Sequence, residues 1–177
     1  MLLREWLPAL TPEGRRPRAI DIACGLGRNS IFLARHGWLV TAVDISEVAL
    51  GHLRELAAAE ALPIVCRQAD LEQTSRLPES LLAPDSYDLA VMFRYTSLEL
   101  IEPLRHGLRI GGGLIVEEHM TTEAQVIGPQ DPRFRVAPGA LREAASRLDI
   151  IDYREGVTED PDGRPAALAQ LVARRTV

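Results

Sequence analysis

The 177-residue sequence contains no lysine, so its twenty basic side chains other than histidine are all arginines. This absence excludes Schiff-base catalysis, the phosphate-binding lysine of a P-loop and the Tyr-x-x-x-Lys pair of short-chain dehydrogenases. Cysteine is also scarce. Cys24 and Cys66 are isolated, which excludes a disulfide framework and a cysteine-rich zinc site, and we predict no metal site.

Long apolar runs and an excess of positive charge are missing as well. No apolar segment approaches the roughly 20 residues of a membrane-spanning helix. Arg4 and Glu5 interrupt the N-terminus too early for a signal-peptide core. The net charge of −5 argues against a surface that neutralises nucleic-acid phosphates. The sequence therefore predicts a cytoplasmic protein with neither a membrane nor a nucleic-acid partner.

The composition is that of an ordinary globular protein, with 46% hydrophobic and 25% charged residues. Chains of about 150 residues bury roughly 70% of the surface that they expose when unfolded, so a sizeable core is expected. The sequence shows no internal repeat and no domain boundary. We predict one domain over residues 1–177, in which residues 1–17 form a short helix and a turn.

Short apolar runs alternate with amphipathic stretches, which indicates a parallel sheet with crossover helices. Residues 111–113, three glycines, predict a turn, and residues 121–137 predict a long loop. The turn-rich segment 160–163 predicts that the last two strands pair as an antiparallel hairpin. The predicted strands are 18–24, 39–43, 63–67, 87–93, 114–118, 149–153 and 166–172, and the predicted helices are 2–10, 28–36, 46–61, 77–82, 98–108 and 138–147.

Acidic residues mark the ends of three successive predicted strands. The first strand contains Asp21 and leads into a Gly-x-Gly turn in front of a helix N-terminus, where a backbone can approach a ligand closely. Asp44 ends the second strand, where a carboxylate can accept both hydroxyls of an adenosine ribose. Asp70 follows the third strand and could accept the exocyclic amine of adenine. Since ligands of open α/β sheets bind at the carboxyl ends of the strands, this pattern predicts a nucleoside cofactor.

Two residues distinguish between possible cofactors. Ser30 stands where the dinucleotide fingerprint needs Gly or Ala for close approach to a pyrophosphate. Asp21 lies in an apolar strand, where a carboxylate is costly unless a cation or a hydrogen-bond donor faces it, and it would repel a pyrophosphate. A ligand with an ammonium and a sulfonium fits better, which favours S-adenosylmethionine. The alternatives are an NAD(P)-dependent oxidoreductase and a module that binds S-adenosylmethionine without transferring its methyl group.

The motif Asp21-x-x-Cys24-Gly25-x-Gly27-Arg28-Asn29, followed by Val43-Asp44-Ile45-Ser46, resembles class I S-adenosylmethionine-dependent methyltransferases. The Gly-Arg-Asn ending and the segments 131–134 and 138–139 resemble the small tellurite-resistance-type branch. The resemblance implies a Rossmann-like, seven-stranded, mostly parallel sheet of order 3-2-1-4-5-7-6, with strand 7 antiparallel and helices on both faces.

The resemblance also implies which residues contact the cofactor. It assigns Asp21 and the backbone of the Gly-x-Gly turn to the methionine moiety, Asp44 to the ribose, and Asp70 with Leu71 to the adenine. The full set of predicted cofactor-binding residues is Asp21, Cys24, Gly25, Gly27, Arg28, Asn29, Asp44, Ile45, Asp70, Leu71 and Arg94.

Candidate catalytic residues follow the fourth and fifth predicted strands. Tyr95 could line a methyl-transfer channel, and His119 could act as a general base near neutral pH, although each also has a purely structural explanation. Alternation along the strand sends Glu118 to the face opposite Glu117 and His119.

The methyl acceptor is predicted to be a small molecule. The end of the fourth strand reads Phe93-Arg94-Tyr95-Thr96 and lacks the Asn/Asp-Pro-Pro-Tyr motif of enzymes that methylate amino groups of nucleic acids or proteins. The resemblance favours a thiol or a chalcogen oxyanion, which needs little help from a base. The sequence does not predict the oligomeric state.

Overall fold

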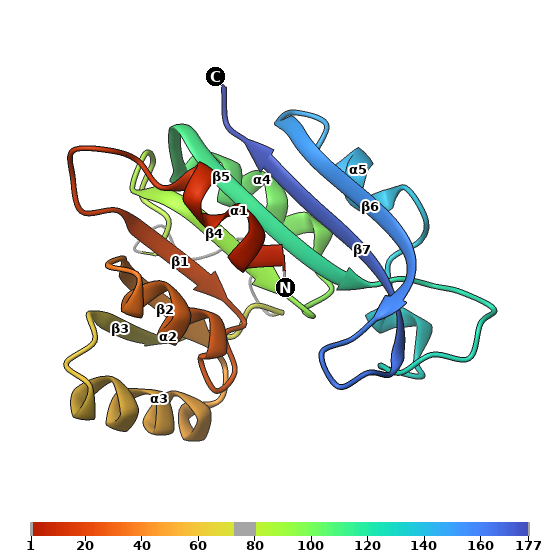
Figure 1. Ribbon diagram of the computed structural model, residues 1–177, viewed down its shortest axis with the longest axis horizontal. Coiled ribbons are helices and arrows are strands. Elements are labelled where there is room, and N and C mark those ends of the chain that lie inside the picture. The colour runs from red at the N-terminus through yellow and green to blue at the C-terminus, as the bar shows by residue number, and fades with distance from the viewer. Residues whose placement is uncertain (1, 73–80, 177) are drawn as a thin grey trace.

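A seven-stranded sheet forms the centre of the computed structural model, which describes residues 2–72 and 81–176. The strand order is β3-β2-β1-β4-β5-β7-β6, with β7 antiparallel to its neighbours β5 and β6 (Figure 1). The predicted topology is therefore confirmed. The strands are β1 (Arg18–Ile22), β2 (Leu39–Asp44), β3 (Ile64–Gln68), β4 (Tyr87–Phe93), β5 (Leu108–His119), β6 (Asp149–Glu159) and β7 (Pro165–Arg174).

Helices cover both faces of this sheet (Figure 1). Helices α1 and α2 share one apolar core with the fully buried Trp38, whereas α4 and α5 contribute to the core on the other face. No helix in the described part of the chain is long and apolar enough to cross a bilayer. The helices are α1 (Leu2–Leu10), α2 (Arg28–Arg35), α3 (Glu47–Ala59), α4 (Ile101–Gly107) and α5 (Ala140–Ala144), and the short 3-10 turns are η1 (Leu98–Leu100) and η2 (Pro132–Phe134).

Strand β4 lies at the centre of the sheet, and all seven of its residues are buried. Its side chains alternate between the two cores: Leu89 and Val91 pack with α1 and α2, whereas Ala90 and Met92 pack with the core of α4 and α5. Burial on both faces explains why the strand reads as a continuous apolar run. Because strands β1 to β5 run parallel to one another, their carboxyl ends lie at one edge of the sheet.

The glycines at 111–113 lie inside β5, so the predicted turn is wrong. Tyr87 pairs with Leu108, but Leu89 pairs with Gly113. An advance of five residues along β5 therefore corresponds to an advance of two residues along β4. The extra residues form a bulge. A Cβ atom at Gly112 would lie 2.8 Å from the Arg109 carbonyl oxygen, so this bulge excludes larger residues there.

Other boundaries also differ from the prediction, most clearly those of β6 and α5, and the helix predicted over 98–108 is divided into η1 and α4. Strand β6 continues past Tyr153 to Glu159, because its polar outer half still pairs with β7. Helix α5 spans Ala140–Ala144 instead of residues 138–147, since Gly139 has a left-handed φ of +79° and a turn follows the helix. The predicted helix at 77–82 lies largely outside the described residues.

The loop predicted over 121–137 is present and is fixed by one arginine. Arg135 donates hydrogen bonds to the carbonyl oxygens of Pro129 at 2.8 Å and Met120 at 2.9 Å. The short turn η2 lies within this loop, where the Asp131 carboxylate accepts a hydrogen bond from the Arg133 N–H. The loop therefore has a defined path over the end of β5.

Asp88 anchors the amino-terminal end of β4. Its buried carboxylate accepts hydrogen bonds from the Arg15 guanidinium at 2.6 Å, the Arg18 backbone N–H at 2.8 Å and the Arg109 guanidinium at 3.1 Å. Burial alone would raise the pKa of Asp88, but these hydrogen bonds outweigh it and hold the pKa below its ordinary value. Asp88 thus ties the segment before β1 to the base of the sheet.

Replacing Asp88 by alanine is expected to lower the free energy of unfolding at pH 7 by about 1.5–3 kcal/mol, because hydrogen bonds to a charged group are lost. The folded pKa lies below the unfolded value of about 3.9, so this stabilisation is present above that pH and disappears as the pH falls through the folded pKa. Urea denaturation at pH 7 and pH 3 measures the effect. The control is Glu47→Gln, which breaks an exposed ion pair with Arg54 and should have a clearly smaller effect on the free energy of unfolding, because solvent screens this pair. Equal losses in the two variants would contradict the anchoring role.

Candidate active site

The segment between β1 and α2 forms a tight turn of left-handed residues. Ala23, Gly25 and Gly27 have φ angles of +52°, +54° and +79°. A Cβ atom at Gly27 would overlap the Leu53 side chain of α3. Ala23 adopts this conformation at a cost of roughly 1–2 kcal/mol. The turn brings the N-terminus of α2 close to the carboxyl end of β1, as a ligand-binding turn requires.

Asp44 connects this turn to the end of β2. One carboxylate oxygen accepts a hydrogen bond from the Gly25 N–H at 2.7 Å, and the other accepts one from the Ser46 N–H at 2.9 Å. The Ser46 hydroxyl itself caps α3 by accepting a hydrogen bond from the Ala49 N–H at 3.2 Å. Each Asp44 oxygen retains a further lone pair. The carboxylate is therefore held in place by the backbone and can still accept ligand hydroxyls.

Asp21 is buried in β1, with an exposed fraction of 1%. The Ser30 hydroxyl donates a hydrogen bond to Oδ2 at 2.6 Å, and no described side chain forms an ion pair with this carboxylate. Burial raises the pKa of Asp21 to about 7, although the hydrogen bond from Ser30 opposes the shift. The charge of Arg28 also lowers this pKa, but Arg28 forms no ion pair with Asp21. Asp21 is thus a buried carboxyl group with a pKa near neutral and no ion-pair partner among the described residues.

The loops after β2 and β3 contribute the remaining predicted adenosine contacts. The Asp70 carboxylate accepts a hydrogen bond from the Glu72 N–H at 3.0 Å, and Leu71 is buried. Ile45, by contrast, is 59% exposed, which is unusual for a large apolar side chain next to a core strand. Because β2 and β3 are parallel neighbours, the residues that end or follow them lie along one edge of the sheet, among them Asp44, Ile45 and Asp70.

Glu118 lies near the end of β5, and Tyr95 follows the neighbouring strand β4. The Glu118 carboxyl is fully buried; Oε2 accepts a hydrogen bond from the Thr96 hydroxyl at 3.3 Å, whereas Oε1 has no hydrogen-bond partner among the described residues. Burial raises the pKa of Glu118 to about 8, so this group is mostly protonated at pH 7. Burial and nearby carboxylates, among them Asp70 and Asp44, raise the pKa of Tyr95. Tyr95 therefore lies near the acids at the predicted cofactor edge.

Arg94 links the ends of β4 and β5 to the β6–β7 hairpin. Its guanidinium contacts Glu117 Oε1 through Nε at 2.8 Å, His119 Nε2 through Nη1 at 3.2 Å and Asp160 Oδ1 through Nη2 at 2.6 Å. Gln170 donates a hydrogen bond to the second Glu117 oxygen at 2.7 Å. These contacts engage three of the five guanidinium N–H donors, so two donors remain for the cofactor contact that the sequence predicts.

His119 has a geometry that does not suit the predicted role of general base. Because Nε2 faces the Arg94 guanidinium, this nitrogen must act as the acceptor, and Nδ1 is buried without a hydrogen-bond partner in the described structure. Gly128 packs tightly against the imidazole ring. Burial, followed by the charges of Arg94 and Arg135, lowers the pKa of His119 to about 4. The ring is neutral at pH 7, but its basic lone pair is already engaged.

Two further predicted residues lie in the turn and in the first turn of α2. The Asn29 side chain is buried, and its Oδ1 accepts no hydrogen bond from any described residue. Cys24 is half-buried, and burial raises the pKa of its thiol, so the thiol is neutral at pH 7. Asn29 therefore offers an unused acceptor, whereas Cys24 offers no nucleophile.

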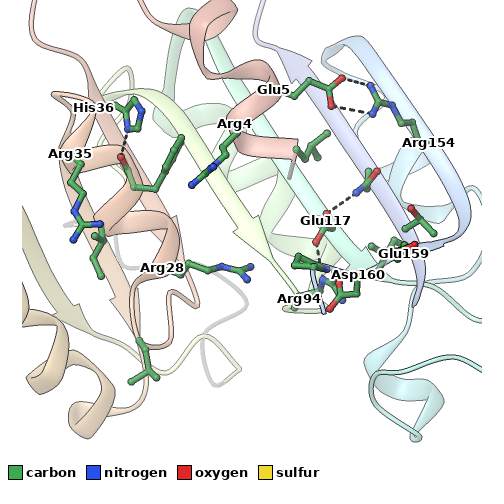
Figure 2. Close-up of a pocket in the computed structure, with 18 of the residues that line it drawn as sticks. Arg4, Glu5, Arg28, Arg35, His36, Arg94, Glu117, Arg154, Glu159 and Asp160 are labelled. Carbon is green, nitrogen blue, oxygen red and sulfur yellow. Dashed lines mark hydrogen bonds and ion pairs between the residues drawn. The ribbon is translucent and has the colours of Figure 1, made fainter. Parts of the chain in front are cut away.

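A cleft of about 1650 Å³ lies beside the turn, between α1, α2 and the β6–β7 hairpin (Figure 2). Arg94 and Glu117 line it, and an ion pair of 2.6 Å between Glu5 and Arg154 connects α1 to β6 across it. Arg28 extends into the cleft from the start of α2 (Figure 2). The predicted cofactor turn and this cleft therefore share a wall.

Residues 19–112, more than half of the chain, match the family described as a methyltransferase domain. The chain belongs to this methyltransferase-domain family. The predicted relationship to class I S-adenosylmethionine-dependent methyltransferases is thereby confirmed, and S-adenosylmethionine is the cofactor that the family implies.

The methyltransferase-domain chain has curated relatives of about twice its length. It is 26% identical over 149 residues to a probable S-adenosyl-L-methionine-dependent methyltransferase, TehB, of Haemophilus influenzae, a match that covers 80% of this chain and 49% of TehB. It is 28% identical over 163 residues to hemagglutinin 1 of Eikenella corrodens, which covers 85% of this chain and 51% of that protein. The chain thus spans about half the length of these relatives.

Solved structures share the methyltransferase fold. The crystal structure of TehB from Haemophilus influenzae has a TM-score of 0.79 at 24% identity and covers 98% of this chain and 61% of that chain. A methyltransferase structure from Methanosarcina mazei has a TM-score of 0.74 at 18% identity and covers 97% of both chains.

The residues at the cofactor edge of this methyltransferase domain fit S-adenosylmethionine. In the described part of the chain, Asp21 forms no ion pair and could receive one from a charged methionine moiety, Asn29 Oδ1 accepts no hydrogen bond, and both Asp44 oxygens can accept a further hydrogen bond. A pyrophosphate would instead face the Asp21 carboxylate. This arrangement and the family match both argue against the NAD(P)-dependent oxidoreductase alternative.

Three features of the site escape sequence reasoning. From the sequence, Ser30 is interpreted only as a residue that fits the dinucleotide fingerprint poorly, but in the structure its hydroxyl donates a hydrogen bond to Asp21. Asp160 reaches Arg94 from a hairpin turn, where acidic residues are common and carry no specific signal. Alternation along β5 places Glu118 opposite Glu117, but it predicts neither the burial of Glu118 nor that its Oε1 has no hydrogen-bond partner among the described residues.

Replacing Asp21 by asparagine is expected to stabilise the ligand-free protein at pH 8 and to weaken S-adenosylhomocysteine binding at least fivefold. Burial of the charge no longer opposes folding, while the cofactor ammonium loses its counter-charge. Because the folded pKa is raised to about 7 from about 3.9, the destabilisation by Asp21 develops as the pH rises between these values. Melting curves at pH 5 and pH 8, with calorimetric titrations, should show the larger stabilisation at pH 8.

The matched control is Asp149→Asn, which removes an exposed carboxylate at the start of β6 and should change neither property. If Asp21→Asn were less stable than the parent at pH 8 and bound the ligand equally well, Asp21 would be a structural residue only.

Proposed function

We propose that this chain is an S-adenosylmethionine-dependent methyltransferase whose acceptor is a small soft nucleophile, either a thiol or a chalcogen oxyanion. The observation that carries the proposal concerns the cleft next to the predicted cofactor site. Of the described histidines, only His119 lies near the strand ends there, and its Nε2 atom is already hydrogen-bonded to Arg94.

S-adenosylmethionine supplies an electrophilic methyl group on a sulfonium. The residues of the chain contribute binding and orientation. Asp44 holds the ribose from a carboxylate that the Gly25 and Ser46 N–H groups fix in place, and Asp21 balances the positive charge of the methionine moiety. Orienting two reactants in this way is worth roughly 7–11 kcal/mol of the barrier.

The state of the titratable side chains favours an acceptor that needs no base. A hydroxyl or an amine must lose a proton during methyl transfer, but Nε2 of His119 faces a guanidinium and Glu118 is mostly protonated at pH 7. A thiol ionises by itself near pH 8.5, and a chalcogen oxyanion is already charged.

The small size of the acceptor is supported by the sequence and by the relatives. The net charge of −5 does not favour binding to nucleic-acid phosphates. The end of β4 also lacks the Pro-Pro-Tyr motif of enzymes that methylate amino groups of nucleic acids or proteins. The resemblance to the tellurite-resistance-type branch, together with the likeness to TehB, supports a thiol or an oxyanion of tellurium or selenium.

A second candidate is a hydroxyl or amine acceptor with Glu118 as the base. Its support is the buried Oε1 atom of Glu118, which lacks a hydrogen-bond partner in the described residues and lies next to the Tyr95–Thr96 segment. This candidate requires a rate that rises as Glu118 loses its proton near pH 8.

The rate of methyl transfer to 2-mercaptoethanol is expected to follow the ionisation of the thiol. His119→Ala, Tyr95→Phe and Glu118→Gln should each lower the rate less than tenfold, because none of these side chains removes the proton. Labelled-methyl transfer, measured between pH 6 and pH 10 in the parent and the three variants, provides the test.

A loss of more than a hundredfold on Glu118→Gln or His119→Ala, or activity on hydroxyl or amine acceptors alone, would contradict the soft-acceptor proposal. Tight binding of S-adenosylhomocysteine with no transfer to any acceptor would instead support the non-catalytic alternative.

A further inference from the structure

The charged side chains that line the cleft are mostly paired with one another or with neighbours. Paired groups are poor anion receptors, because a ligand must displace an existing partner before it binds. The pairs are Glu5 with Arg154 at 2.6 Å, Arg35 with Glu60 at 2.6 Å, and Arg94 with Glu117 at 2.8 Å and with Asp160 at 2.6 Å.

Two guanidinium groups in the cleft have no such pairing. Arg4, on α1, and Arg28, at the start of α2, form neither an ion pair nor a hydrogen bond with any residue in 2–72 or 81–176. Both extend from the α1–α2 side into the cleft (Figure 2). The Arg4 guanidinium lies 5.4 Å from the centre of the Phe32 ring, a cation–π distance that favours one orientation of the side chain.

The opposite wall carries the reverse charge. Glu159, near the tip of the β6–β7 hairpin, also lines the cleft and forms no ion pair with a described residue. An anionic group in the cleft is therefore repelled from the hairpin and attracted to the helices. This polarity gives the cleft a preferred orientation for a charged ligand.

We infer that the acceptor is a small organic molecule with an anionic group, such as a carboxylate, which Arg4 binds in the cleft with support from Arg28. This inference rests on the proposed function and specifies its substrate class. The nucleophilic atom would lie at the other end of the molecule, toward the turn after β1.

The apolar part of the cleft argues for an organic stem between the two ends. Leu26, which is 68% exposed, Ile31 and Phe32 line the same wall as the two arginines. Pockets for organic ligands typically measure about 300–1,000 Å³, and this cleft is larger. An inorganic oxyanion would leave most of that apolar surface uncovered.

The test compares two ligands that differ only in charge, 6-(methylthio)hexanoate and 6-(methylthio)hexanol, which are the methylated forms of matched thiols. Calorimetric titration into the full chain saturated with S-adenosylhomocysteine measures both dissociation constants without turnover. The acid is expected to bind at least tenfold more tightly than the alcohol at low salt, and 0.5 M NaCl should reduce this preference.

Arg4→Gln is expected to reduce the preference for the acid to less than threefold. The matched control is Arg67→Gln, which removes from β3 an exposed arginine that also forms no ion pair with a described residue and lies outside the cleft. It should leave the preference unchanged. Melting temperatures of both variants show whether the fold is intact.

Equal binding of the two ligands, no binding of either, or an equal loss of both on Arg4→Gln would overturn the inference. The proposed function is tested separately by labelled-methyl transfer to 6-mercaptohexanoate and 6-mercaptohexanol. Transfer to both thiols with equal efficiency would support the proposed methyltransferase function and contradict the anionic acceptor. Charge-selective binding without transfer would support the binding of an anionic ligand in the cleft and contradict the proposed function.

Discussion

The hydrogen bond between the Gly25 N–H and the Asp44 carboxylate is the contact on which the cofactor edge depends. It ties the left-handed turn after β1 to the end of β2, and the second Asp44 oxygen fixes Ser46, where α3 begins. Leu53 of α3 then packs against Gly27, where a larger residue would not fit. One carboxylate thus sets the relative positions of two strands, a turn and a helix, and the same carboxylate is the predicted ribose ligand.

The two acids of this edge differ because their surroundings differ. The Asp44 carboxylate accepts hydrogen bonds from two backbone N–H groups, which hold it in place for hydrogen bonding to a ligand. Asp21 is buried, and its hydrogen bonds from described residues come from Ser30, so its ionised form is costly until a cation approaches. A sulfonium ligand with an ammonium group and no phosphate fits both acids, whereas a dinucleotide fits Asp44 but not Asp21.

Sequence reasoning succeeds where one local cause determines the structure. Strand β4, which is buried on both faces, reads as an apolar run, and the acids near the ends of β1 and β2 identify the predicted cofactor edge. It fails where partners come from distant elements: Asp160 reaches Arg94 from the hairpin, and Arg94 in turn engages His119. The glycines at 111–113 signal an unusual backbone, but only the pairing with β4 distinguishes a bulge from a turn.

The central claim is that the acid edge binds an S-adenosyl ligand through Asp44. Calorimetric titration of the parent chain and Asp44→Ala with S-adenosylhomocysteine and with NAD⁺ tests it most directly. The account predicts saturable binding of S-adenosylhomocysteine to the parent, no binding of NAD⁺, and a loss of at least tenfold in the variant, since a charge-assisted contact is worth about 1.5–3 kcal/mol. Equal affinity of parent and variant for S-adenosylhomocysteine, or binding of NAD⁺ in its place, would contradict it.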